Sequence, residues 1–264
     1  MTKKTSSSAA APLILLTNDD GVFAEGILAL GRGLKGLGRT AIVAPDREKS
    51  ASSLALSLHR PLRVKRIRPD VFAVDGTPVD CIYLALKQLL PRVPDLIVSG
   101  MNPGPNLGQQ DVAYSGTVAA AIQGTFFGVP SAAFSLTADA DGDFHYQESA
   151  VIVREIAVRL LHHGLPAGVT LNINIPPPPF KGLRITNVGL KIYEPEIIEK
   201  KDPRENSYYW LGRGNPRVAG DRKSDVRAVE QGFISASPLQ HDPTDRKAMG
   251  LPFLRDLAAA FRRA

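Results

Sequence analysis

Two adjacent acidic residues, Asp19 and Asp20, directly follow the turn-favouring Asn18 and an apolar run at residues 13–16. Such a run predicts a buried, parallel strand, and ligands bind at the carboxyl ends of strands in open α/β sheets. Neighbouring carboxylates repel each other unless a cation lies between them. The pair is therefore a candidate metal site. The alternative is a solvated turn, because Asn, Asp and Gly all favour turns.

Two further polar segments follow predicted strands at residues 40–44 and 95–100. The first segment ends at Ser50, and the second is a loop rich in glycine and proline that contains Asn102. Hard divalent cations such as Mg²⁺ and Mn²⁺ prefer oxygen ligands. We therefore expect the two aspartates to supply negative charge and Ser50 and Asn102 to add neutral oxygen ligands.

The same loop and the next predicted helix contain groups that suit a phosphate. Asn106 supplies an amide, while Ser115, Gly116 and Thr117 offer two hydroxyls and free backbone N–H groups at a helix start. A plain helix cap would explain the Ser-Gly-Thr sequence alone, but the upstream glycines favour a phosphate site. Asn18 is counted with these candidate substrate-binding residues.

Other candidate sites are weaker. Residues 139–143 resemble a calcium loop, but the glycine comes too early and the distant glutamate is missing. The five histidines show neither metal-ligand spacing nor a catalytic triad, and the sequence contains no Gly-x-Ser-x-Gly motif. We expect a solvated loop at 139–143 and assign no histidine to catalysis.

An α/β core must bring these candidates together. Apolar residues recur at helical spacing from Ile27 to Leu37, between the first strand and the strand at 40–44. Thr77, Pro78 and Asp80 are typical of a helix start. The remaining elements are predicted as a hairpin at 62–74, strands at 95–100, 129–136 and 170–175, and helices at 118–123 and 147–161. We expect the core to span residues 13–180.

The rest of the chain is expected to lie outside this core. We expect residues 1–12 to form a disordered tail and residues 181–250 to form an irregular extension that leaves the sheet. Residues 251–264 are expected to form a helix. No apolar stretch reaches the roughly 18 to 20 residues of a membrane span. The single cysteine, Cys81, fits a reducing compartment, so we expect a cytoplasmic protein without a membrane partner.

The net charge of +6 raises the question of nucleic acid. Most of the excess lies in residues 181–264, which hold 16 basic and 11 acidic residues. This segment lacks the aromatic interleaving of a single-strand binder. Solvated surface is therefore favoured over a nucleic-acid partner.

Several motifs occur in one order along the chain. They are NDDG at 18–21, APDREKS at 44–50, GTPVDC at 76–81, SGMNPGPNLG at 99–108, YSGTVAAA at 114–121 and a final stretch at 224–239. With these motifs the sequence resembles the survival protein SurE family of metal-dependent 5′-nucleotidases. The resemblance implies that the four oxygen ligands chosen above bind one Mg²⁺ or Mn²⁺ per subunit, and that Asn106 and residues 115–117 surround the phosphate.

The resemblance also implies a Rossmann-like, three-layer, mostly parallel α/β fold. It further implies a C-terminal hairpin extension exchanged between subunits of a homodimer or homotetramer. The expected reaction is hydrolysis of nucleoside 5′-monophosphates to nucleoside and phosphate, with 3′-nucleotides and short polyphosphate as further candidate substrates.

The metal would act as a Lewis acid, with Asp19 and Asp20 as catalytic residues. Either acid could accept the proton of the attacking water or act as a nucleophile. Two alternative functions stay open. One is a non-catalytic nucleotide or phosphate sensor with the same metal site, and the other is a glycosyltransferase-like enzyme whose metal bridges a diphosphate.

Overall fold

A nine-stranded sheet forms the centre of the protein in the computed structural model, which describes residues 11–194, 196–212, 214, 216–219 and 221–261. The strand order is β3-β4-β2-β1-β5-β6-β7-β13-β8. The strands are β1 (Leu13–Thr17), β2 (Arg39–Pro45), β3 (Val64–Arg68), β4 (Val71–Val74), β5 (Leu96–Pro103), β6 (Ser131–Leu136), β7 (Val169–Ile175), β8 (Leu183–Ile185) and β13 (Ile234–Gln240). All neighbours from β4 to β7 are parallel, as predicted.

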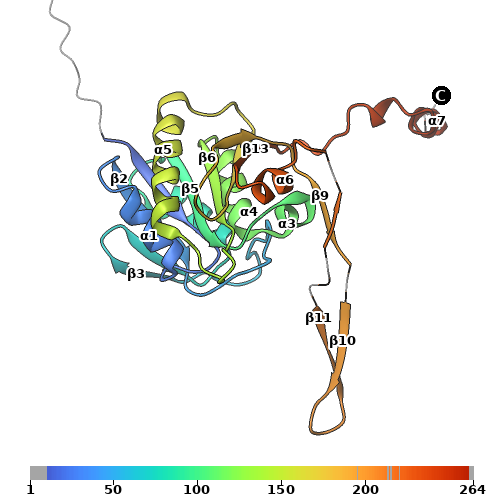
Figure 1. Cartoon of the computed structure of the whole chain (residues 1–264), viewed down its shortest axis with the longest axis horizontal. Helices are drawn as coiled ribbons and strands as arrows, with labels where there is room; N and C mark the ends of the chain where they lie inside the picture. Colours follow the sequence, from blue (N-terminus) through green and yellow to red (C-terminus); the bar gives the residue numbers. More distant parts are fainter. Residues whose placement is uncertain (1–10, 195, 213, 215, 220, 262–264) are drawn as a thin grey trace, which may run out of the picture.

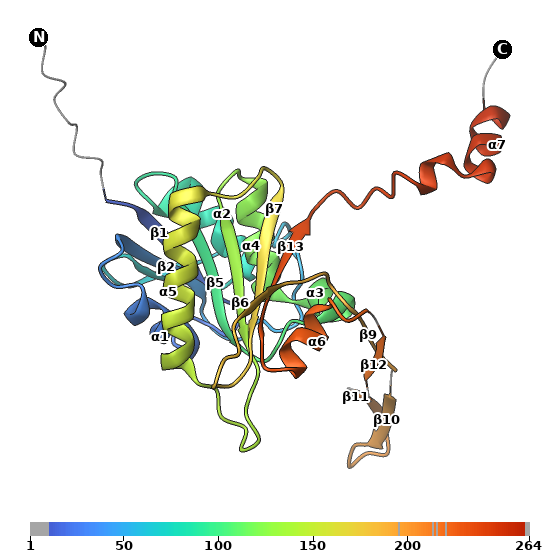
Figure 2. The ribbon, with the colours of Figure 1, turned by 45° about the horizontal axis from the view of Figure 1, so that its top comes forward.

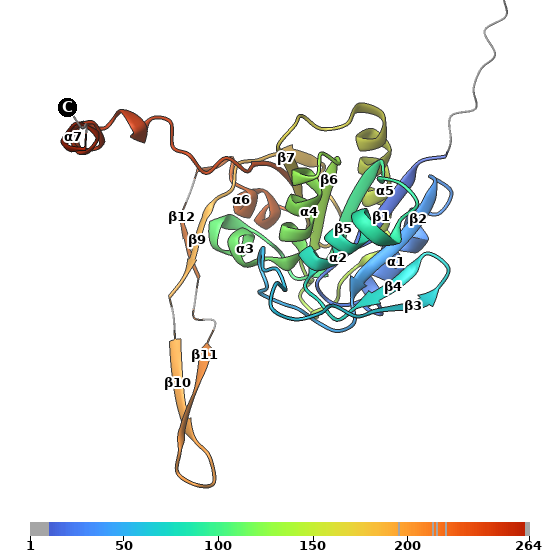
Figure 3. The same cartoon turned by 180° about the vertical axis from the view of Figure 1, so that it is seen from behind.

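Helices cover both faces of this sheet and make it the middle of three layers. On one face α1 (Glu25–Gly33) packs against α5 (Tyr146–His163), as Figure 1 shows. On the other face α2 (Pro78–Leu84) packs against α4 (Gly116–Phe126), as Figure 3 shows. Every residue of β1 is buried, which explains its uniformly apolar start, because a parallel strand covered on both faces has no solvent side. The predicted three-layer, mostly parallel α/β fold is confirmed.

Helix α2 begins as the sequence predicts. The Thr77 hydroxyl accepts a hydrogen bond from the backbone N–H of Asp80 (3.1 Å), and the Asp80 carboxylate accepts one from the N–H of Thr77 (2.9 Å). Pro78 occupies the first turn, where its missing N–H costs nothing. Cys81 is buried in this helix, and burial raises the pKa of its thiol.

The order in which the chain adds strands to the sheet reverses at β1. This strand lies between β2 and β5, and the chain runs first to β2 and only later returns to β5. Ligands in open α/β sheets bind at such a switch point, beyond the carboxyl ends of the strands. The NDDG turn follows β1 there, and Asn102 lies near the end of β5.

The C-terminal part of the chain builds an arm and a separate helix. Strand β9 (Leu190–Tyr193) pairs with β12 (Pro216–Ala219), and β10 (Glu196–Lys201) pairs with β11 (Ser207–Gly212). Together these ladders project from the core in Figure 1. Helix α7 (Pro252–Ala260), preceded by the 3₁₀ turn Ala248–Gly250, lies away from the core in Figure 2.

One sequence-based expectation for this region is wrong. Residues 181–250 do not leave the sheet throughout, because β13 pairs antiparallel with β7 and β8 pairs parallel with β13. The short helix α6 (Asp225–Glu230) precedes β13. Pairing between strands that are distant in sequence leaves no local signal. The sequence therefore did not predict that the chain returns to the sheet as β8 and β13.

Two expectations concern the ends of the chain. Residues 1–10 of the expected N-terminal tail lie outside the described residues. Within the predicted C-terminal helix, α7 covers residues 252–260, and residues 262–264 again lie outside the described part. None of the helices in the described ranges combines the length and the apolar character needed to cross a membrane.

Candidate active site

The turn after β1 is closed by Asn18. Its side-chain amide donates to the Gly21 carbonyl (3.0 Å), and its side-chain oxygen accepts from the Gly21 N–H (3.2 Å). Asn18 is fully buried and is not among the described residues that line the neighbouring cavity. The side chain expected to bind substrate therefore shapes the turn that presents the two aspartates.

Asp19 is held by the start of α4. The Thr117 hydroxyl donates to Asp19 Oδ1. A Cβ atom on Gly116 would lie 2.8 Å from the Asp19 Cβ and 2.8 Å from Ser52 Oγ, so only glycine allows this close approach. Gly116 and Thr117 are both buried and do not line the cavity within the described residues. The structure thus places both residues against the Asp19 side chain, and their expected contact with phosphate stays a prediction.

The electrostatics of the two aspartates favour a bound cation. Burial raises the pKa of Asp19, although the Thr117 hydrogen bond opposes this. Burial, followed by the negative charges of Asp19 and Glu48, raises the pKa of Asp20 to about 7. Asp20 Oδ2 is also buried without a hydrogen-bond partner. Such an oxygen is costly unless a ligand satisfies it, and adjacent carboxylates select a cation. The donor set thus fits a divalent ion.

Ser50 and Asn102 line the same cavity as the aspartates. The Ser50 hydroxyl donates to Glu48 Oε1 (2.5 Å), which leaves its lone pairs available. The Asn102 amide nitrogen donates to the Gly104 carbonyl (2.6 Å), which leaves the side-chain carbonyl oxygen as the potential ligand. Across the described ranges, no three His, Cys, Asp or Glu side chains form a metal-binding group. A cation here would therefore need these neutral oxygens.

Ser115 faces the cavity from the beginning of α4. Its hydroxyl accepts a hydrogen bond from the Val118 N–H (3.0 Å), so it caps the helix and keeps its own proton to donate. The positive end of the helix dipole lies at the same point. Of the three residues predicted at this helix start, Ser115 is the one that lines the cavity.

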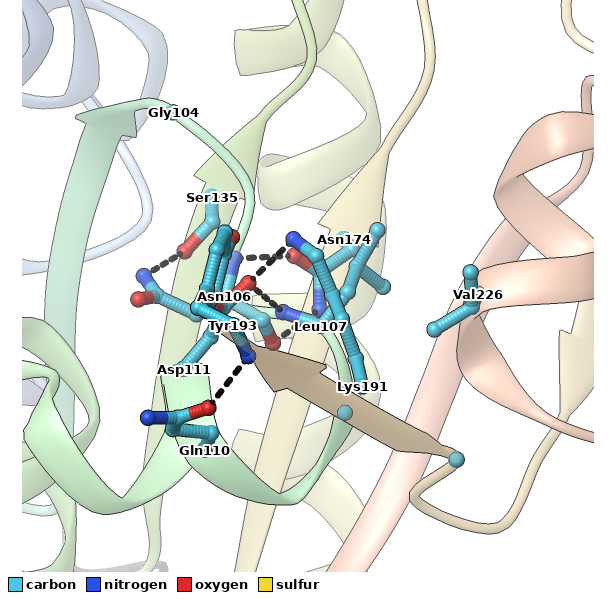
Figure 4. Close-up of polar contacts among 12 residues, drawn as sticks. Gly104, Asn106, Leu107, Gln110, Asp111, Ser135, Asn174, Lys191, Tyr193 and Val226 are labelled. Carbon is cyan, nitrogen blue, oxygen red and sulfur yellow. Dashed lines mark hydrogen bonds and ion pairs between the residues drawn. The ribbon is translucent and has the colours of Figure 1, made fainter. Parts of the chain in front are cut away.

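Asn106 is fixed by a network of hydrogen bonds, which Figure 4 shows. Its N–H donates to Asn174 Oδ1 (2.8 Å), and its side-chain amide donates to Ser135 Oγ (2.6 Å). Its backbone carbonyl accepts from the side-chain amides of Asn172 (2.9 Å) and Asn174 (3.1 Å). Asn106 also lines the cavity, so its amide is held ready for a ligand.

Sequence reasoning missed the two β7 asparagines. They were detectable in principle, because residues two apart on a strand point to the same face, and a buried strand with two asparagines on one face must satisfy both amides.

A second missed group forms the far wall of the cavity. Helix α3 (Gly108–Tyr114) contributes Gln110 and Asp111, and strand β9 contributes Lys191 and Tyr193. Lys191 Nζ lies 2.7 Å from Asp111 Oδ2, and the Tyr193 N–H donates to Gln110 Oε1 (2.7 Å; Figure 4). No short-range pattern links two segments so far apart in sequence.

The side chain of Asp139 holds the loop at 139–143 together. Asp139 Oδ1 accepts from the N–H groups of Asp141 (3.0 Å) and Asp143 (2.9 Å), and Asp139 Oδ2 lies 2.8 Å from His145 Nε2. None of the described cavity-lining residues comes from this loop, and none is a histidine.

Comparison with known proteins agrees with this architecture. The family model described as "Survival protein SurE" matches residues 14–195. The 5′-nucleotidase SurE of Syntrophotalea carbinolica is 47% identical over 233 residues, covering 88% of this chain and 93% of the relative. The 5′-nucleotidase SurE of Vibrio vulnificus is 45% identical, and the match covers 91% of this chain and 94% of the relative.

The crystal structure of the SurE protein from Aquifex aeolicus is similar to the whole fold. It superimposes with a TM-score of 0.81 at 38% identity and covers 93% of this chain and 100% of that one. By its family match, its relatives and its fold, the chain belongs to the survival protein SurE family.

Proposed function

We propose that this protein is a divalent-metal-dependent phosphatase that hydrolyses nucleoside 5′-monophosphates to nucleoside and phosphate. One observation carries the proposal: Asp20 presents a buried, unpartnered carboxylate oxygen beside Asp19 at the switch point of the sheet. The name 5′-nucleotidase, given to relatives that cover nearly the whole chain, supports the substrate class.

The oxygens of Asp19, Asp20, Ser50 and Asn102 would hold one metal ion per subunit, either Mg²⁺ or Mn²⁺. When bound, the ion supplies positive charge that polarises the phosphoryl oxygens. The described side chains that line the cavity include five carboxylates and one lysine, which is paired with Asp111. An anionic substrate therefore needs the metal to enter.

The protein's own groups then position the phosphoryl group. The Ser115 hydroxyl and the N-terminus of α4 stabilise its negative charge, and the fixed amide of Asn106 lies in the same cavity. Asp19 serves as a rigid ligand, because Thr117 already occupies one of its oxygens. Asp20 is the better candidate to take the proton of the attacking water and to return it to the nucleoside oxygen as the P–O bond to the nucleoside breaks.

We also propose that the arm and α7 are exchanged between subunits of a homodimer or homotetramer. Several large apolar side chains there are exposed, among them Trp210 and Leu211 on β11 and Phe253 on α7. Apolar surface of this kind marks an interaction site. The buried, reduced Cys81 agrees with a cytoplasmic location, which belongs to the same proposal.

The test is phosphate release from a panel of nucleoside monophosphates with Mn²⁺, with Mg²⁺ and with EDTA. The panel includes 5′- and 3′-nucleotides and short polyphosphate, and the Asp19→Asn protein is assayed in parallel. We expect metal-dependent release from 5′-monophosphates that the substitution abolishes. Nucleotide binding without release by folded protein, with either metal, would overturn the phosphatase and establish a sensor.

A further inference from the structure

The cavity is larger than a phosphate ion requires. Its volume of about 850 Å³ lies within the range of sites that hold whole small molecules. The metal ligands and Ser115 occupy its strand-end side. The remaining space is enclosed by α3, β9 and the base of the arm, so this second side must accommodate the organic part of a substrate.

This second side is held rigidly. Besides the two contacts of Gln110 and Asp111 with β9, the Gln109 N–H donates to the Gly189 carbonyl (2.9 Å) just before that strand. A Cβ on Gly108 would lie 2.5 Å from the Lys191 Cβ, so helix and strand are in close contact. A wall fixed by this many contacts can bind a ligand without first becoming ordered.

Of the two tyrosines in this wall, Tyr193 is the more buried. Its backbone is anchored to Gln110, and Lys191 Nζ lies 5.0 Å from its ring centroid, a cation–π contact that orients the ring. Tyr114 also lines the cavity, but 57% of it is exposed. A fixed, half-buried ring loses less entropy on binding than an exposed one.

The charges on this side favour a neutral group. Lys191 is neutralised by Asp111, with both side chains largely buried, and Glu196 adds a further negative charge to the lining. A second phosphate would find no unpaired cation among the described lining residues. A nucleobase, which is uncharged and has a π face, fits these groups.

We propose that Tyr193 determines substrate specificity by stacking against the base of the nucleotide. This inference rests on the proposed function and deepens it, because it assigns the nucleoside end of the substrate to the β9–α3 wall. Stacking area grows with the base, so purine nucleotides are preferred over pyrimidine nucleotides.

The test compares Tyr193→Leu and Tyr193→Phe with the wild type, with AMP and ribose 5-phosphate as substrates. Leucine removes the ring but keeps the backbone N–H that binds Gln110. We expect Tyr193→Leu to raise the KM for AMP about tenfold, with kcat and the KM for ribose 5-phosphate unchanged. Tyr193→Phe should behave as the wild type. Tyr83→Leu, at a half-exposed tyrosine of α2 that packs on Phe127, is the matched control.

Calorimetric titration with adenosine in EDTA measures the same subsite without metal or turnover. Adenosine should bind wild-type protein and bind Tyr193→Leu about tenfold more weakly. An unchanged adenosine affinity, or an equal rise in KM for AMP and ribose 5-phosphate, would overturn the stacking role. If the wild type releases no phosphate with either metal, the proposed function fails, and the adenosine titration still decides the role of Tyr193.

Discussion

The strand-end site and the C-terminal arm use their side chains in opposite ways. At the strand ends polar groups are buried and fixed. Asp19 accepts a hydrogen bond from Thr117, and Asn106 is hydrogen-bonded to the side-chain amides of β7. Along the arm apolar groups are exposed: Ile197, Tyr209 and Trp210 each keep more than half of their surface accessible.

The difference shows which kind of partner each region needs. Buried polar atoms without a partner are stable only when a polar or charged ligand satisfies them, whereas exposed apolar surface is stabilised when another polypeptide covers it. Under the proposed function, the core would therefore bind an ion and a phosphate, and the arm would bind a second subunit. Tyr193, at the base of the arm, is where the two regions meet in one cavity.

The largest expected effect comes from removing charge at the strand ends. Asp20→Asn should lower the rate of phosphate release about a thousandfold or more, because the metal contributes several kcal/mol to transition-state stabilisation. Asp141→Asn removes an acid from the solvated 139–143 loop and is the matched control, which should keep full activity. The measurement is kcat with saturating Mn²⁺, with circular dichroism to check folding.

The position of the Asp19 side chain can be tested separately from its charge. In Gly116→Ala the new methyl group would displace Asp19, so kcat should fall about a hundredfold while the net charge stays constant. Gly31→Ala is the control, because its Cβ would meet no atom closer than 3.8 Å. Equal activity of the two variants would show that the close approach of α4 to Asp19 is not needed.

Local signals account for the parts that the sequence predicted well. Thr77, Pro78 and Asp80 specify the start of α2 by contacts within one turn. Uniform apolar runs identified the covered parallel strands, since neither face meets water. Once the strands were identified, the polar loops after them could be placed at one edge of the sheet. The predicted oxygen ligands in these loops do lie along one cavity.

Contacts between distant segments account for what was missed. Thr117 donates a hydrogen bond to Asp19, 98 residues earlier in the chain, and no local pattern predicted this contact. Lys191 and Tyr193 reach the cavity only because β9 packs on α3, 80 residues earlier. Neither composition nor periodicity encodes such approaches.

The exposed aromatic side chains of the arm can be tested for a role in subunit association. Trp210→Asp should weaken subunit association about thirtyfold, since a buried tryptophan is typical of interface hot spots worth at least 2 kcal/mol. Val151→Asp places the same charge at an exposed apolar residue of α5 and should leave association intact. Sedimentation at several concentrations measures the difference. Equal association of the two proteins would exclude β11 from the interface.

The smallest effect concerns pH. Because the pKa of Asp20 is raised to about 7, the metal-free folded protein binds this proton more tightly than the unfolded chain does. That contribution to stability is complete below about pH 4 and is lost as the pH rises through 7. A divalent ion replaces the proton, so it should raise Tm by a few degrees more at pH 8 than at pH 5.5.

Asp20→Asn is the control for this pH effect. The asparagine cannot titrate, so the variant should lose most of the difference between the two pH values. Thermal melts with EDTA and with Mg²⁺ check both proteins. A metal-induced rise in Tm that is the same at pH 5.5 and pH 8 in the wild type would contradict the assignment.

Strand β13 has a consequence for the order in which the protein can fold during its synthesis. It pairs with β7 only after residues 235–240 have left the ribosome, well after the other strands of the parallel core. Until then β7 is an open edge whose N–H and C=O groups can pair with another nascent chain. The last part of the core to be synthesised therefore protects the part that precedes it, and a chain that stops before residue 234 would be prone to aggregation.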